Sequence, residues 1–563
     1  MVKNKYIKVG NTHNSLNNNL VSPQLNTDQW QILIILHRTL LYEHHDFLFA
    51  SQHPSASPAL QRFTTKYAMP ARIWRYGIYN LLELIKHRLP NSLEYMLTFI
   101  YFSYLIMALL YKTVPAFEYM WIKCLGDLSR YRKIWTTVSR QWYSRASDIV
   151  PTTGRLYHHL AILTRPNVVT QLFYYAKSLC VPIPFNGTRD SIFTLFEPIM
   201  ADTHGKLNAV DCALVRCHRI FFTGKGTENL EKARQKFLSN LDLAVAKNAR
   251  RWFETGYQIA VTNFCAFFGY GLPANLLIKA FDASTKKIPM PKIVFTDEPI
   301  SVESQTTCPK MQKSSNANNK NDITATMEIK KDVVDPSKYF KKILQFVEST
   351  DTIILSRLGD LNIFFYTIVK LTFLLAMVRL KGPGGNKPIT PTISHFEASF
   401  PWNLFYLYLN FFAAGFKTPE KYEQNDFPRT AERRPLPEDW AMRGLMWANP
   451  AKVVFPREYF AVTENMEKNK RMFKTPSMGE QRRKKCLWLA YQIAQIGTLG
   501  DADKKGEGRW ITYNPDTKMF LPAAKYVSNL EIRPLETELA NINLRQKIDM
   551  EHFLAKKKTK NLS

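Results

Sequence analysis

The sequence is poor in the residues that bind metals or form disulfides. Its seven cysteines are scattered along 563 residues, and no two of them have CxxC spacing. This odd, dispersed set is typical of a reducing compartment and does not suit a disulfide scaffold. The histidine pairs His44-His45 and His158-His159 are adjacent in sequence, so on a helix each pair points to two different faces. We therefore expect no metal site and no cofactor.

Catalytic sequence motifs are missing as well. The glycine-rich stretch KGPGGNK, which begins at Lys381, does not have the spacing of a phosphate-binding loop and predicts a surface turn. The sequence contains no GxSxG, no HExxH and no group of carboxylates suited to a two-metal nuclease. These absences disfavour an enzyme, and we expect a protein without catalytic residues.

Acidic residues are few compared with basic ones. The chain has 76 lysines and arginines against 47 aspartates and glutamates, which gives a formal net charge of +29. A charge of this sign and size favours an anionic partner, such as nucleic acid, a phosphoprotein or an acidic membrane surface. Charge alone does not choose among these partners.

Apolar runs of clear membrane-spanning length are also lacking. The uncharged run Tyr95–Tyr111 reaches only the lower edge of that range, and its tyrosines are spread along it. A second run, residues 361–380, carries Lys370 at its middle, which is costly in lipid. The N-terminus lacks the apolar segment of a secretory signal. We expect both runs to be buried helices of a soluble protein with no membrane partner and no small-molecule substrate.

Helical periodicity is present almost throughout the chain. Apolar residues recur at spacings of one, three and four, and short breaks of proline, glycine and asparagine separate the periodic segments. This succession is typical of an α-solenoid. Ser139, Tyr143, Ala146 and Pro151 keep the spacing of the second half of a tetratricopeptide unit. Both a divergent tetratricopeptide-like hairpin and a generic helical hairpin fit this segment.

Composition divides the chain into several regions. The most polar segment has SSNANNKND at its centre and predicts a linker, and the chain ends in the basic AKKKTKNLS. The proposed regions are a disordered N-terminus (1–28), a helical domain (29–200), a second helical region (201–296), a disordered linker (297–336), a further helical block (337–500) and a mostly irregular basic tail (501–563).

One basic stretch suits a nucleic-acid backbone. Eight lysines and arginines lie between residues 468 and 485, opposed only by Glu480, and Trp488 and Tyr491 follow. Basic residues interleaved with aromatic ones favour phosphate contacts with stacked bases. The alternative is a solvated basic helix face. The candidate nucleic-acid-binding residues are Lys470, Arg471, Lys474, Arg482, Arg483, Lys484 and Lys485.

A second charged cluster, CLGDLSRYRK, follows the apolar run that ends at Tyr111. On a helix, Asp127 shares a face with Arg130 and Tyr131. An arginine fork beside a tyrosine hydroxyl can bind phosphate, provided that the helices form a groove. The alternative is a surface ion pair that contributes little to stability.

Several stretches resemble the Est/Smg family, which comprises telomerase-associated Est proteins and Smg adaptors of nonsense-mediated mRNA decay. They are GDLSRYR at 126–132, WYSRASDIVPTTGRLYHHLAIL at 142–163, FYYAKSLCVPIPF at 173–185 and PLPEDWAMRGLMWA at 435–448. SQHPSASPAL, MPARIW and LEYMLTFIYF look most like the fungal members.

The resemblance implies an all-α protein. Its N-terminal domain would be 14-3-3-like, built of tetratricopeptide-like helices, and an α-helical-hairpin domain would follow it. An Est-type DNA/RNA-binding domain is implied over 201–296 and 337–500, and no PIN nuclease is visible in this sequence. In the family, the 14-3-3-like groove of decay adaptors binds a phosphorylated helicase, and the telomerase branch contacts telomerase RNA and single-stranded DNA.

The resemblance also implies residues for the phosphopeptide groove. Arg130 and Tyr131 match the family's GDxxRY motif, and Lys177 matches the basic residue of its YYxRS motif. The groove's lysine falls on Tyr79, which removes one phosphate donor, and Arg75, one turn earlier, could compensate. Where the family has Tyr-Asn-Gln-Leu, this chain has Tyr157-His158-His159-Leu160.

We therefore expect a non-catalytic adaptor of nucleus and cytoplasm that binds RNA or single-stranded DNA and acts in nonsense-mediated mRNA decay or telomere maintenance. Its protein partners would be phosphorylated decay-helicase or telomerase components. The alternative is a pure protein–protein scaffold whose helical groove binds a protein or phosphoprotein and which does not contact nucleic acid.

Overall fold

The computed structural model describes most of the chain. The described residues are 25–201, 207–247, 249–275, 277–279, 336–379, 399–414, 416, 418–424, 435–448, 455, 457–460, 476–496 and 510–522. The predicted N-terminal segment and the predicted linker lie almost wholly outside these ranges.

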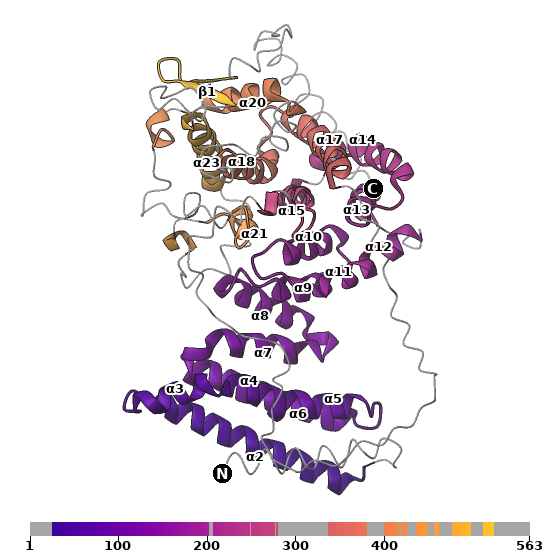
Figure 1. Cartoon of the computed structure of the whole chain (residues 1–563), viewed down its shortest axis with the longest axis vertical. Helices are drawn as coiled ribbons and strands as arrows, with labels where there is room; N and C mark the ends of the chain where they lie inside the picture. Colours follow the sequence, from indigo (N-terminus) through magenta and orange to yellow (C-terminus); the bar gives the residue numbers. More distant parts are fainter. Residues whose placement is uncertain are drawn as a thin grey trace, which may run out of the picture.

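Helices that follow one another in sequence stack from one end of the molecule toward its middle (Figure 1). Asn26 begins this stack with a capping box, in which Asn26 and Gln29 each accept a hydrogen bond from the other's backbone N–H. The elements of the stack are α2 (Thr27–Ser51), α3 (Pro58–Lys66), α4 (Met69–Arg72), the π-helix η1 (Ile73–Tyr79), α5 (Asn80–Lys86), α6 (Leu93–Thr113), η2 (Pro115–Phe117), α7 (Glu118–Arg130), η3 (Lys133–Trp135), α8 (Thr136–Ile149), α9 (Gly154–Leu163) and α10 (Val168–Leu179).

The α7–α8 hairpin, predicted as either a tetratricopeptide-like or a generic helical hairpin, packs closely around one aromatic ring. A Cβ atom at Gly126 would lie 3.1 Å from the ring of Tyr143, so the glycine lets α7 approach that ring. The Ser139 hydroxyl donates to the Gly126 carbonyl at 3.0 Å, and Ala146 is fully buried. Small residues at 126, 139 and 146 therefore bring the two helices together around one aromatic ring.

The second block packs around the long apolar helix α18, at the other end of the molecule (Figure 1). Its elements are α11 (Thr188–Ser191), α12 (Phe193–Met200), α13 (Ala209–Thr223), η4 (Thr227–Asn229), α14 (Leu230–Lys247), α15 (Ala249–Phe267), α17 (Pro336–Leu355), η5 (Leu361–Ile363), α18 (Phe364–Val378), α20 (Trp402–Ala414), η6 (Pro419–Lys421), α21 (Pro437–Met442), η8 (Arg457–Phe460) and α23 (Pro476–Gln495).

The described strands form one small hairpin. β1 (Ile511–Asn514) and β2 (Met519–Pro522) pair antiparallel, with Ile511 opposite Pro522. Asn410 of α20 donates to the Phe520 carbonyl and accepts from its N–H, which fixes the hairpin to the helix. The hairpin was not predicted, and the mostly irregular character of the tail stays a prediction, because only residues 510–522 of that region are described. The all-α prediction is confirmed for the chain as a whole.

In the part of the chain that the structure describes, buried apolar residues form three clusters. One lies among residues 30–128, a small second one among 122–181, and the largest extends from Ala161 to Phe520. The proposed boundary at residue 200 therefore falls within the sequence range of the largest cluster, because α10 packs against α13 and α15. The domain division itself stays a prediction.

Among the described residues, two helical segments are long and apolar enough to cross a membrane by length and composition alone. In the segment Leu361–Val378, 89% of the 18-residue window is buried, as expected for a core helix, and Lys370 pairs there with Asp351 at 2.6 Å. Only 39% of the window in α6 is buried. The expectation of a buried helix therefore holds for α18, whereas α6 exposes one apolar side.

Candidate phosphate and nucleic-acid site

Arg130 lies at the C-terminal end of α7, where its guanidinium interacts with His159, Asp127 and Tyr143. Nη1 lies 2.9 Å from Nδ1 of His159 and 3.9 Å from the carboxylate of Asp127. Asp127 in turn accepts a hydrogen bond from the Tyr143 hydroxyl. About a third of the Arg130 side chain is exposed, so the guanidinium can reach a ligand as well as its protein partners. The surface ion pair predicted as the alternative is present only as this long contact.

His159, beside Arg130, has an unpaired hydrogen-bond donor. A guanidinium can only donate, so Nδ1 of His159 accepts from Arg130 and the ring proton lies on Nε2. Burial lowers the pKa of His159 well below its usual value, and the nearby Arg130 lowers it further, so the ring is neutral at pH 7. Nε2 is buried and has no partner among the described residues. The Nε2–H group therefore lies on the side of the ring away from Arg130 and is not exposed to a ligand.

Tyr131 points toward a different neighbour. Its hydroxyl donates to Oε1 of Glu83 at 2.9 Å, and Glu83 also pairs with Lys86 at 3.1 Å. Burial and this hydrogen bond raise the pKa of Tyr131, and the nearby Tyr79 raises it further. Tyr79, in the position of the expected lysine, therefore lies on the Tyr131 side of the site. A carboxylate on that side opposes phosphate binding.

Lys177 lies in the interior, away from any phosphate groove. It is 3% exposed, and its ammonium donates to the Ala441 carbonyl at 2.7 Å and lies 4.3 Å from the centre of the Tyr157 ring. The prediction that Lys177 binds phosphate needs correction, because these partners use the ammonium and no face of it is exposed. Arg75 is exposed and lies over the ring of Tyr76.

The basic helix α23 is only partly a surface helix. Arg482 and Lys485 are 3% and 1% exposed, and they pair with Glu438 and Asp439. Trp488, which was expected to stack on bases, is buried and donates to the Gln424 carbonyl at 2.8 Å. For these three residues the predicted nucleic-acid contact is corrected: their side chains hold α23 in the core.

Two of the remaining basic candidates are half-buried, and three lie outside the described residues. Arg483 is half-buried and donates to the Phe412 carbonyl at 2.9 Å, and burial lowers its pKa. Lys484 is half-buried. Lys470, Arg471 and Lys474 lie outside the described residues, so their role stays a prediction.

The segment around α21 contacts both blocks, and these contacts were not predicted from the sequence. Glu438 and Asp439 bind α23, and the Ala441 carbonyl accepts from Lys177 of α10. The Met446 N–H donates to the Cys180 carbonyl at 3.2 Å, and Gly444 lies against Pro151 at the turn between α8 and α9. The adjacent acids Glu438 and Asp439 were the sequence signal for the contacts with α23, because buried carboxylates need cationic partners.

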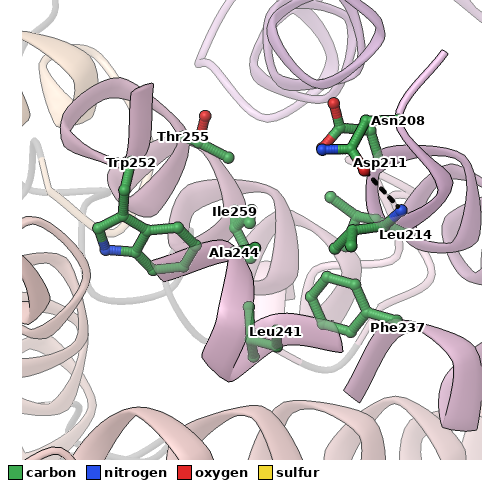
Figure 2. Close-up of a pocket in the computed structure, with 10 residues that line it drawn as sticks. Asn208, Asp211, Leu214, Phe237, Leu241, Ala244, Trp252, Thr255 and Ile259 are labelled. Carbon is green, nitrogen blue, oxygen red and sulfur yellow. Dashed lines mark hydrogen bonds between the residues drawn. The ribbon is translucent and has the colours of Figure 1, made fainter. Parts of the chain in front are cut away.

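A pocket lies between α13, α14 and α15, and its lining is mostly apolar (Figure 2). Phe237, Leu241 and Trp252 contribute to its wall, and Asp211 supplies a carboxylate. An apolar wall with a carboxylate does not suit an anionic ligand, so this pocket is not part of the candidate phosphate site.

Comparison with known proteins links the chain to the predicted family. Residues 139–268 match the family model described as the Est1 DNA/RNA binding domain. The nonsense-mediated mRNA decay factor SMG7 of Danio rerio is 25% identical over 132 residues, and the telomerase-binding protein EST1A of Danio rerio is 33% identical over 81 residues. The resemblance to the Est/Smg family is confirmed.

These similarities cover limited parts of the proteins. The alignment to SMG7 spans 22% of this chain and 11% of that relative, and the alignment to EST1A spans 13% and 5%. A crystal structure of Est1 and Cdc13 has a chain of the same overall fold, with a TM-score of 0.52 at 9% identity over 92% of this chain and 99% of that chain.

The matched Est1 segment runs from α8 to the end of α15. It contains His159 and Lys177 and starts after Arg130 and Tyr131. The family match therefore does not include Arg130 and Tyr131. A phosphate site at the end of α7 rests on the contacts of these two residues alone.

Proposed function

We propose that this protein is a non-catalytic adaptor that binds RNA or single-stranded DNA and brings it to a protein partner, in nonsense-mediated mRNA decay or in telomere maintenance. The observation that carries this proposal is the match of residues 139–268 to the Est1 DNA/RNA binding domain. The relatives named for both pathways and the net charge of +29 support it. An adaptor of this kind acts in the nucleus and the cytoplasm.

Binding would rest on phosphate contacts, with little dependence on base sequence. Arg482 and Lys485 are occupied by Glu438 and Asp439, so the basic stretch contributes through its other members. The proposed contacts are Lys470, Arg471, Lys474, Arg483 and Lys484.

A salt series tests nucleic-acid binding. A fluorescent single-stranded RNA of 20 nucleotides is titrated with the full chain from 50 to 500 mM salt, and we expect affinity to fall steeply as salt rises. Replacing Lys470, Arg471 and Lys474 together by glutamine removes three phosphate contacts. The slope of log affinity against log salt should then become shallower by about 2, at roughly 0.7 per contact.

The matched control is the triple glutamine variant of Arg62, Lys66 and Lys86, which changes the net charge equally on exposed side chains of the N-terminal helices. It should leave the slope nearly unchanged. If the wild type fails to bind RNA or DNA even at 50 mM salt, the chain is a protein–protein scaffold instead.

The second candidate function is phosphopeptide binding by Arg130, favoured by the partial exposure of its side chain. The ligand would be a phosphorylated decay-helicase or telomerase component. Arg130→Ala should weaken a phosphoserine peptide at least ~10-fold, since a charge-assisted contact contributes about 1.5–3 kcal/mol. Glu83→Gln should strengthen binding, because it removes a carboxylate from the Tyr131 side. Calorimetry measures both, and equal affinities of the wild type and Arg130→Ala would exclude the site.

A further inference from the structure

Exposed apolar side chains gather on one side of α6 and at the beginning of α8. Tyr101, Leu105 and Leu109 follow one another at helical spacing along α6 and are 48%, 66% and 42% exposed. Ile134 and Val138, in η3 and α8, are 74% and 36% exposed. We call these five residues the α6–α8 face. Single exposed leucines are ordinary, whereas a group of five on adjoining elements indicates a binding surface.

Aromatic rings join the two halves of this face. The ring of Trp135 lies 5.2 Å from that of Tyr101 and 5.5 Å from that of Tyr104, measured between centres. Trp142 donates to the Tyr104 hydroxyl at 3.0 Å and packs on Tyr111. α7 packs against both α6 and α8. The half-buried rings of Tyr104, Trp135 and Trp142 contact one another between α6 and α8. Figure 1 shows α6, α7 and α8 as successive layers of the stack.

Cations border the apolar side chains. Arg132 lies 5.0 Å from the ring centres of Tyr101 and Trp135, and Arg38 of α2 lies 4.9 Å from that of Phe102. Lys112 and Arg145 lie over the ring of Tyr111. α6 carries one acid, Glu94 in its first turn, and α8 carries one, Asp148 near its end. Glu118 of α7 lies 3.5 Å from Arg145.

These features favour a protein ligand over nucleic acid. The most exposed members, Leu105 and Ile134, are aliphatic and offer no flat ring for a base to stack on. Tyr101, the aromatic member of the face, already contacts the edge of Trp135 and has Arg132 over its ring. A helix presenting apolar side chains at spacings of three and four would fill the line from Tyr101 to Leu109, and carboxylates on its flanks would meet the bordering cations.

We propose that the α6–α8 face binds an acidic amphipathic helix of a partner protein. The apolar side of that helix packs on Leu105, Leu109 and Ile134, and its carboxylates pair with Arg38, Lys112 and Arg132. The proposal goes beyond the proposed function, because none of the nucleic-acid or phosphate candidates belongs to this face.

The test uses a synthetic 18-residue helical peptide with leucines at spacings of three and four and glutamates on its flanks. Its binding to the full chain is measured by fluorescence anisotropy at 50 mM salt. The variant Leu105→Ser/Ile134→Ser should weaken binding at least ~10-fold, as expected when central apolar contacts are removed. Since both side chains are exposed, the variant should keep the wild-type helical circular dichroism.

The control variant is Leu361→Ser, a leucine that is 57% exposed in η5, outside the face, and it should bind like the wild type. A peptide with lysines in place of the glutamates should bind at least ~5-fold more weakly at 50 mM salt, and the difference should vanish at 500 mM. RNA affinity should be the same in the double variant and the wild type, which separates this proposal from the proposed function.

Three results would overturn the proposal. One is equal peptide affinity of the double variant and the wild type, and another is equal affinity of the acidic and basic peptides. The third is a wild-type dimer in sedimentation that Leu105→Ser/Ile134→Ser converts to a monomer, because a second copy of the chain would then cover the face.

Discussion

Replacing Arg482 by alanine should destabilise the protein by about 3–5 kcal/mol, as expected when one partner of a buried ion pair is removed. Its guanidinium donates to both carboxylate oxygens of Glu438, at 2.7 and 3.2 Å, and lies 4.0 Å from the centre of the Phe365 ring. Glu438 is fully buried, so the alanine variant leaves its charge in the core without a partner. The measurement is the shift of the urea unfolding midpoint.

Two comparisons isolate the cause. The double variant Glu438→Leu/Arg482→Met should recover most of the loss, because an apolar pair of similar size carries no buried charge. Lys86→Ala breaks an exposed pair with Glu83 and should cost at most about 0.5 kcal/mol. If Arg482→Ala kept its stability and instead lost RNA affinity, Arg482 would be a nucleic-acid ligand after all.

Gly444→Ala should destabilise the protein by about 2–4 kcal/mol, the sum of a strained backbone and a steric clash. Gly444 has φ of +85°, a conformation that favours glycine. A Cβ atom there would lie 2.0 Å from the Pro151 carbonyl oxygen, so the chain after α21 would have to move away from the α8–α9 turn. The thermal unfolding midpoint should fall accordingly.

Gly479→Ala is the matched control for this substitution. Gly479 lies in α23, and no atom lies within 4 Å of the place where its Cβ would be. Alanine there should be neutral or stabilise the helix by up to about 1 kcal/mol. Equal effects at the two positions would mean that the contact between Gly444 and Pro151 does not hold the two blocks together.

Arg482→Ala and Gly444→Ala both test the contacts that join the segment around α21 to the two blocks. Arg482 binds α21 from the second block, and Gly444 lets the segment after α21 lie against the first block. A decrease in stability that both variants share would indicate that α21 couples the N-terminal stack to the largest core.

Local sequence was sufficient to predict the helices and the resemblance to a family. The 3.6-residue repeat of apolar side chains and the proline breaks act over a few residues, so they can be seen without knowing the fold. The spacing of Ser139, Tyr143, Ala146 and Pro151 predicted a helical hairpin, whereas the end of α7 at Arg130 is seen only in the structure. The family resemblance rested on such short motifs, and the Est1 domain match bears it out.

The roles of the charged residues were decided only by tertiary structure. Arg482 and Lys484 are close together in one basic run, yet one is buried against Glu438 and the other is half-exposed, because helix packing turns one face of α23 into the core. Lys177 matches a phosphate-binding position in its local motif, but its ammonium donates to the Ala441 carbonyl, 264 residues away in sequence.

Long-range pairing also explains the other differences. Tyr131 donates to Glu83 from a separate helix, and the β1–β2 hairpin docks on Asn410. The alternation of apolar and polar residues in ITYN is a local signal of a strand, but it does not name the partner. Periodicity reports which face of an element is apolar, whereas the partner of a charge depends on residues that folding brings together from distant parts of the chain.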